Sequence, residues 1–82
     1  MLEVSYEPNF LKIIEKIKDT SFKEKIKKQI EKITENPEIG KPMRYGRKGT
    51  REVYVSPFRL SYLYIKEKNR IVISDLYHKD EQ

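Results

Sequence analysis

Apolar side chains in the first half of the chain recur every three to four residues. One apolar stripe runs from Phe10 to Ile17, and a second runs from Phe22 to Ile33. This spacing places each stripe on one face of an amphipathic helix. The pattern predicts helices over residues 9–18 and 21–35, and the short link between them predicts an antiparallel helical hairpin.

Capping side chains stand at the predicted helix ends. Asn9 can cap the first helix, and Ser21 with Glu24 has the spacing of a capping box at the start of the second. Asn36-Pro37 should end the second helix, because the residue before a proline disfavours helical backbone angles.

The second half of the chain alternates in the manner of strands. Strands are predicted over residues 51–55, 58–66 and 70–78, and residues 2–6 form a further short strand. The connections between the later strands are short, as antiparallel neighbours permit and parallel ones do not. The economical architecture is α+β, with residues 1–82 as one domain whose two N-terminal helices cover one face of an antiparallel sheet of three to four strands.

Alternation also assigns side chains to the two faces of the sheet. If positions 53, 55, 60 and 62 face the helices, the intervening side chains point to the opposite face. These outward side chains are Glu52, Tyr54, Arg59 and Ser61. The last strand is apolar on both sides and has no unique assignment. His78 joins Arg59 on the outward face if Ile71 and Ile73 point at the core.

Composition restricts the class of protein. Only 37% of the residues are apolar and 38% are charged, which predicts a thin core under a heavily charged surface. With no cysteine, one histidine and no acid cluster, neither a disulfide framework nor a metal site is expected, and no cofactor is indicated. No apolar run approaches the roughly 20 residues of a membrane span, and the N-terminus lacks a signal-peptide pattern, so a cytoplasmic location is expected.

Positive charge is concentrated in one short segment. The chain has a net charge of +5, and residues 41–59 alone hold six cations against the single acid Glu52. A concentrated basic field favours a polyanion such as RNA, DNA or an acidic protein. The alternative is a solvated basic loop, and charge alone leaves both interpretations open.

Several pieces of the C-terminal half resemble the RelE/ParE toxin superfamily of type II toxin–antitoxin systems. They are Lys48-Gly49, Arg51–Val55, Phe58–Tyr62 with its R-x-x-Y pattern, and Leu76–Lys79. The two preceding helices match the family's order as well, so the resemblance spans essentially the whole chain. It implies two N-terminal helices packed on a curved antiparallel sheet, and an acidic antitoxin that covers the basic face.

The resemblance to the RelE/YoeB-like branch implies metal-independent cleavage of mRNA on the ribosome. Such chemistry needs a base for the 2′-hydroxyl, a cation for the phosphate and an acid for the leaving oxygen. Arg59 is predicted to be the cation, the alternative being an ion pair with Glu52 or Asp75. His78 is predicted to transfer a proton, the alternative being a surface histidine without a role. Glu52 is either the general base or a charge balancer.

Further residues are predicted to contact RNA. Tyr54 either stacks on a base or is a partly buried sheet tyrosine. The remaining candidates, which would bind the RNA backbone, are Arg44, Arg47, Lys48, Arg51 and Lys79.

The chain also departs from the family. RelE carries lysines where this chain has Glu52 and Tyr54. Many relatives also have a tyrosine after the final His/Arg pair, and this chain lacks that tyrosine. The catalytic glutamate of the YoeB-like branch would fall near Met43-Arg44 and is absent. These departures leave the identity of the base open. The first alternative function is that of ParE-like members, which inhibit DNA gyrase by binding and do not cut RNA. The second alternative is an inactive or antitoxin-sequestered relative.

Overall fold

The computed structural model describes residues 2–43 and 48–81. Within them the chain forms a five-stranded sheet and two α-helices, with a short 3-10 helix at Lys66–Lys68 and another at Lys79–Glu81. The helices and strands are β1 (Glu3–Tyr6), α1 (Pro8–Lys16), α2 (Thr20–Glu35), β2 (Lys41–Pro42), β3 (Thr50–Val55), β4 (Phe58–Ile65) and β5 (Arg70–His78). Neither α-helix is long and apolar enough to cross a lipid bilayer.

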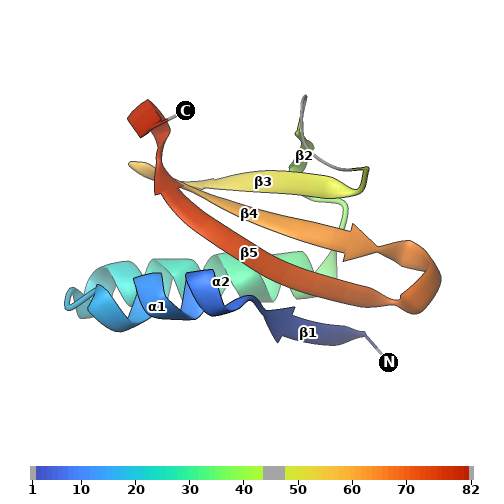
Figure 1. Cartoon of the computed structure of the whole chain (residues 1–82), viewed down its shortest axis with the longest axis horizontal. Helices are drawn as coiled ribbons and strands as arrows, with labels where there is room; N and C mark the ends of the chain where they lie inside the picture. Colours follow the sequence, from blue (N-terminus) through green and yellow to red (C-terminus); the bar gives the residue numbers. More distant parts are fainter. Residues whose placement is uncertain (1, 44–47, 82) are drawn as a thin grey trace.

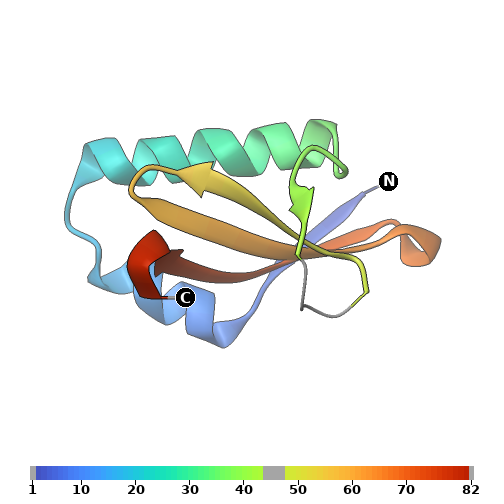
Figure 2. The ribbon, with the colours of Figure 1, turned by 90° about the horizontal axis from the view of Figure 1, so that it is seen from above.

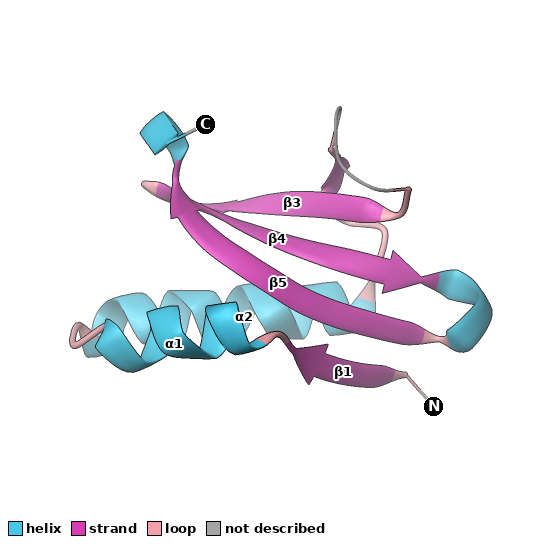
Figure 3. Ribbon diagram, viewed as in Figure 1, coloured by secondary structure: helices cyan, strands magenta, loops and turns pink. Residues whose placement is uncertain are grey.

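The helices and the sheet form two layers. Both helices lie on one side of a strongly curved sheet, whose other side they leave uncovered (Figures 1 and 3). Seen from above, α1 lies along the β5 side of the sheet and α2 along the β3 side (Figure 2). The predicted α+β architecture with two N-terminal helices on one face is confirmed.

The sheet is larger and less uniform than the sequence predicted. Its strand order is β1-β5-β4-β3-β2, which makes five strands where three to four were expected. β1 runs parallel to β5, so the sheet is mixed. The parallel pairing is possible because both helices and three strands separate β1 from β5 along the chain, which leaves ample length for a crossover. β2 comprises only two residues and pairs with the first part of β3.

The helix starts differ from the predicted caps. α1 begins at Pro8, whose fixed φ suits the first helical position, and the Asn9 side chain donates to Asp75 Oδ1 at 3.1 Å instead of capping. α2 is capped by Asp19, whose Oδ1 accepts from the Ser21 backbone N–H at 2.9 Å. Asp19 thus takes the position that the predicted capping box gave to Ser21.

The core lies between the helices and the sheet. It consists of Phe10, Ile26, Ile33, Val55, Leu60, Tyr62, Ile71, Ile73 and Leu76. Phe22 packs at its margin, with its ring centroid 5.1 Å from that of Phe58. The apolar stripes of both helices therefore face the sheet as predicted.

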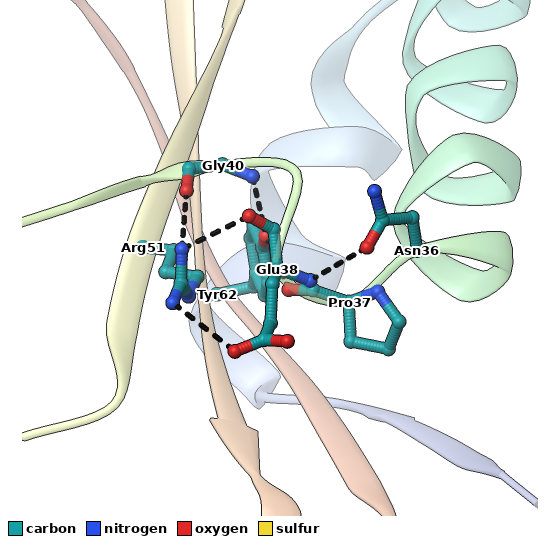
Figure 4. Close-up of polar contacts among 6 residues, drawn as sticks. All are labelled: Asn36, Pro37, Glu38, Gly40, Arg51 and Tyr62. Carbon is teal, nitrogen blue, oxygen red and sulfur yellow. Dashed lines mark hydrogen bonds and ion pairs between the residues drawn. The ribbon is translucent and has the colours of Figure 1, made fainter.

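A polar cluster fastens the link between α2 and β2 to the sheet (Figure 4). The buried Tyr62 hydroxyl donates to the Pro37 carbonyl at 2.8 Å and accepts from the Gly40 N–H at 2.9 Å. Burial raises the pKa of Tyr62, although the hydrogen bond from Gly40 opposes this shift. Arg51 Nη1 donates to the carbonyls of Gly40 at 2.7 Å and Glu38 at 3.0 Å. The start of β2 is thereby held against β3.

Candidate functional site

Three side chains from neighbouring strands meet on the uncovered face of the sheet. Glu52 belongs to β3, Arg59 to β4 and Tyr77 to β5. Arg59 Nη1 donates to Glu52 Oε1 at 3.0 Å, and the Tyr77 hydroxyl donates to Glu52 Oε2 at 2.6 Å. The side chains of Arg59 and Glu52 are 33% and 20% exposed, so solvent reaches this Glu52–Arg59–Tyr77 cluster.

A β-bulge in β5 decides which residue completes the cluster. Ser61 of β4 lies opposite Asp75, whereas Tyr62 lies opposite Ile73, so Ser74 is the extra residue. One extra residue shifts the alternation of the strand that follows it. The buried positions of β5 are accordingly 71 and 73 before the bulge, and 76 after it.

The predicted placement of His78 beside Arg59 is therefore wrong. The two isoleucines of β5 do point at the core, as that placement required, but the bulge puts Tyr77 opposite Arg59 and His78 opposite Phe58. The His78 ring lies edge-on to Phe58, with centroids 5.4 Å apart. Its Nδ1 accepts from the Asp80 backbone N–H at 3.2 Å. His78 thus belongs to the helix-covered side of the sheet.

A basic groove adjoins the cluster along the edge of β3 that β2 leaves unpaired. The described residues that line it are Gln29, Lys32, Ile39, Lys41, Glu52, Val53, Tyr54, Arg59 and Lys79. Four of them are cations and one is an acid, so the groove suits an anionic ligand. Tyr54 lies directly opposite Arg59 and is 51% exposed, which leaves part of its ring available for contact.

The other predicted RNA contacts do not gather at this groove. Arg51 lies opposite Tyr62, on the helix-covered side, where it binds two carbonyls and pairs with Glu38 at 3.8 Å. Lys48 lines a separate hollow together with Glu38 and Arg51. Arg44 and Arg47 lie outside the described residues.

The sequence pattern did not indicate Tyr77 as a member of the cluster, but it did indicate its partners Glu52 and Arg59. Alternation correctly placed Glu52, Tyr54 and Arg59 on one face, because β3 and β4 pair without interruption between Tyr54 and Ser61. Unbroken alternation from Ile71 and Ile73 would put Tyr77 on the helix-covered side, because the residues of β5 carry no signal of a bulge. Lys32 and Lys41 were likewise missed, because they join the groove only through tertiary packing.

The described part of the chain holds no group of three or more His, Cys, Asp or Glu side chains placed to bind a metal ion. The groups that the cluster offers are a guanidinium, a carboxylate and a phenol. Together they can bind an anion, accept a proton and donate a hydrogen bond.

Comparison with protein families identifies the class of protein to which this chain belongs. Residues 4–82 match the family model described as ParE toxin of type II toxin–antitoxin system, parDE. The chain belongs to this family, within the RelE/ParE superfamily, and is a toxin of the type II toxin–antitoxin class. No curated protein sequence matches it.

Solved structures show the same fold. The isolated RelE toxin of E. coli matches with a TM-score of 0.78 and 23% identity, over 95% of this chain and 84% of that one. The intact E. coli RelBE toxin–antitoxin complex matches with a TM-score of 0.78 and 23% identity, over 95% and 96% of the two chains. A metal-bound toxin from Helicobacter pylori matches with a TM-score of 0.69 and 22% identity, over 99% and 98%.

Proposed function

We propose that this toxin is a metal-independent endoribonuclease that cleaves mRNA in the cytoplasm, with the ribosome as the place of cleavage. The observation that carries the proposal is the position of Arg59, which lies at the basic groove between an exposed tyrosine ring and a carboxylate. Cleavage through a 2′-hydroxyl requires a cation for the phosphate, a proton acceptor for the hydroxyl and a proton for the leaving oxygen, and the site supplies the first two together with a stacking surface for a base.

Each group of the site has a proposed role. Arg59 neutralises the charge that develops on the scissile phosphate, and its planar guanidinium can bind two phosphate oxygens. Tyr54 stacks on a base next to the cleaved bond. Lys41 and Lys79 bind the flanking backbone without reading its sequence. Glu52 is proposed to accept the 2′-hydroxyl proton as the 2′-oxygen bonds to the phosphorus, while the bond to the 5′-oxygen breaks and that oxygen takes a proton from the solvent that reaches the cluster. His78 is given no part in proton transfer, because it lies on the opposite face.

A second candidate function is gyrase inhibition by binding alone. Two observations favour it: the family model is that of ParE toxins, and both carboxylate oxygens of Glu52 are engaged by donors. A binding protein needs no free base, and the basic groove would then contact a protein partner.

Induction of the toxin without its antitoxin separates the two functions. In wild-type cells we expect new mRNA 5′ ends and unchanged DNA supercoiling. Arg59→Ala should remove the 5′ ends. The matched control is Arg70→Ala, since Arg70 also pairs with a glutamate, Glu3 at 3.3 Å, but on β5 and β1 away from the groove. If the DNA becomes relaxed and no new 5′ ends appear, the toxin is a gyrase inhibitor and the proposed nuclease function is wrong.

We propose an acidic antitoxin as the partner that covers the basic groove. Exposed charge pairs are screened over about 10 Å at 0.1 M salt, so the affinity should fall as salt rises. Salt-insensitive association would place the antitoxin instead on the apolar groove between the helices, which is lined by Tyr6, Phe10, Ile14, Lys23, Ile26, Lys27, Ile30 and Glu31.

A further inference from the structure

The carboxylate of Glu52 is bound as an anionic ligand would be. Each of its oxygens accepts a hydrogen bond from a different donor, Arg59 at 3.0 Å and Tyr77 at 2.6 Å. The three side chains come from three adjacent strands, so the sheet backbone sets their separation (Figure 1). Arg59 and Tyr77 are direct cross-strand partners, which aims their polar ends at one point above the sheet.

We propose that Glu52 occupies the place of an RNA phosphate, and that Arg59 and Tyr77 bind this phosphate when RNA displaces the carboxylate. This inference rests on the proposed ribonuclease function and deepens it. A carboxylate and a phosphodiester both present two terminal oxygens that share a negative charge, and both accept charge-assisted hydrogen bonds from the same donors. Tyr77 is thereby a phosphate-binding residue, in addition to Arg59.

The surroundings make the exchange feasible. The cluster is partly exposed and borders a groove that holds Lys32, Lys41 and Lys79, which attract the incoming polyanion. Only side chains must move, because the main-chain hydrogen bonds of β3, β4 and β5 involve none of the exchanged groups. Once displaced, Glu52 remains beside the phosphate, where its freed oxygens can accept the proton of the 2′-hydroxyl.

Glu52 also makes the site selective between ligands. In the free toxin it neutralises Arg59 and occupies both donors, so a weak or short anion must compete with a carboxylate that is already in place. A longer RNA gains additional contacts to the lysines and to Tyr54, and it can therefore displace Glu52 where a single phosphate does not. The Glu52–Arg59–Tyr77 cluster thus favours the binding of RNA strands over the binding of isolated phosphate groups.

Binding of a short 2′-O-methyl RNA oligonucleotide tests the exchange without cleavage. Fluorescence anisotropy would be measured for wild type, Glu52→Ala, Tyr77→Phe and the double variant. Glu52→Ala should strengthen binding about tenfold, because the competing anion is gone. Within the Glu52→Ala background, Tyr77→Phe should weaken binding by about three- to tenfold, because a hydrogen bond to a charged oxygen is lost. Tyr6→Phe removes a hydroxyl on the helix side and should change nothing.

The double variant distinguishes direct contact from support of Glu52. If Tyr77→Phe has no effect once Glu52 is alanine, Tyr77 acts only by positioning the glutamate and the proposal is overturned. Unchanged or weaker binding by Glu52→Ala, with the fold verified by circular dichroism, overturns it as well. Cleavage of unmodified RNA is assayed separately. If the oligonucleotide binds as expected and no RNA is cut, the phosphate site stands and the ribonuclease function fails.

Discussion

Two arginines on opposite faces of the same sheet are each paired with a glutamate, and their other partners distinguish them. Arg51 lies on the helix-covered side, where it binds the carbonyls of Gly40 and Glu38 in addition to the Glu38 carboxylate (Figure 4). Arg59 lies on the uncovered face, where its hydrogen bond goes to the carboxylate of Glu52.

The difference in hydrogen-bond partners indicates which of the two arginines can exchange its partner for a ligand. Backbone carbonyls that accept from Arg51 would lose their partner if the guanidinium turned to a phosphate, and the α2–β2 link would keep only its hydrogen bonds to Tyr62 among those described above. A carboxylate side chain can instead rotate away and be replaced by another anion. Basic residues close in sequence therefore differ in role: Arg51 holds backbone carbonyls, whereas Arg59 is the arginine that we propose binds the ligand, a division that charge density does not reveal.

The largest effect is expected from Arg59→Ala. RNA cleavage should fall by roughly 10²–10³-fold, because the charge on the phosphate loses its preorganised donor. The melting temperature should stay near that of wild type, since a partly exposed ion pair adds little to stability. Single-turnover cleavage and thermal unfolding, measured on the same preparation, check both statements. Substantial activity in this variant would remove Arg59 from the mechanism.

Arg51→Met should show the reverse behaviour. Loss of hydrogen bonds from a charged donor to two carbonyls should lower the free energy of unfolding by about 2 kcal/mol. Methionine keeps the apolar stem, so the loss reports on the guanidinium. Denaturant titration measures the change, and cleavage at low temperature should remain within a few-fold of wild type. A stable but inactive Arg51→Met protein would instead place Arg51 in RNA binding.

Tyr62→Phe should lower the free energy of unfolding by about 1–2 kcal/mol, because the Pro37 carbonyl and the Gly40 N–H of the α2–β2 link lose their common partner. The raised pKa of Tyr62 adds a pH signature. The unfolded chain releases the tyrosine proton near the ordinary pKa of 10.0, before the folded chain does, so stability falls as pH rises above that value. Tyr62→Phe should lack this part of the alkaline loss when unfolding is followed between neutral and alkaline pH.

The smallest effect is expected from His78→Ala. The ring lies against Phe58 on the side of the sheet away from Arg59, so cleavage should fall by less than about tenfold, well below the 10²-fold typical of a lost proton-transfer group. A loss of 10²-fold or more would show that His78 reaches the substrate by a rearrangement of the chain end. His78→Phe, which keeps an aromatic ring against Phe58 but cannot transfer a proton, controls for the loss of ring packing.

The sequence by itself determined both α-helices, four of the five strands and much of one face. Helical spacing located α1 and α2, and alternation placed Glu52, Tyr54 and Arg59 together, because regular periodicity is a local property that residue order encodes directly. The resemblance of short segments around Arg59 and His78 indicated the toxin family, which the match over residues 4–82 confirms.

Tertiary structure decided the rest. The bulge at Ser74 turns Tyr77 toward Arg59 and His78 toward Phe58. The residues of β5 do not predict this bulge, because the strand is apolar on both sides. The parallel pairing of β1 with β5 joins segments nearly the whole chain apart. The position of Arg51 likewise depends on carbonyls of the α2–β2 link. Register, strand order and hydrogen-bond partners arise from contacts between distant segments, whereas local periodicity records only which residues share a face.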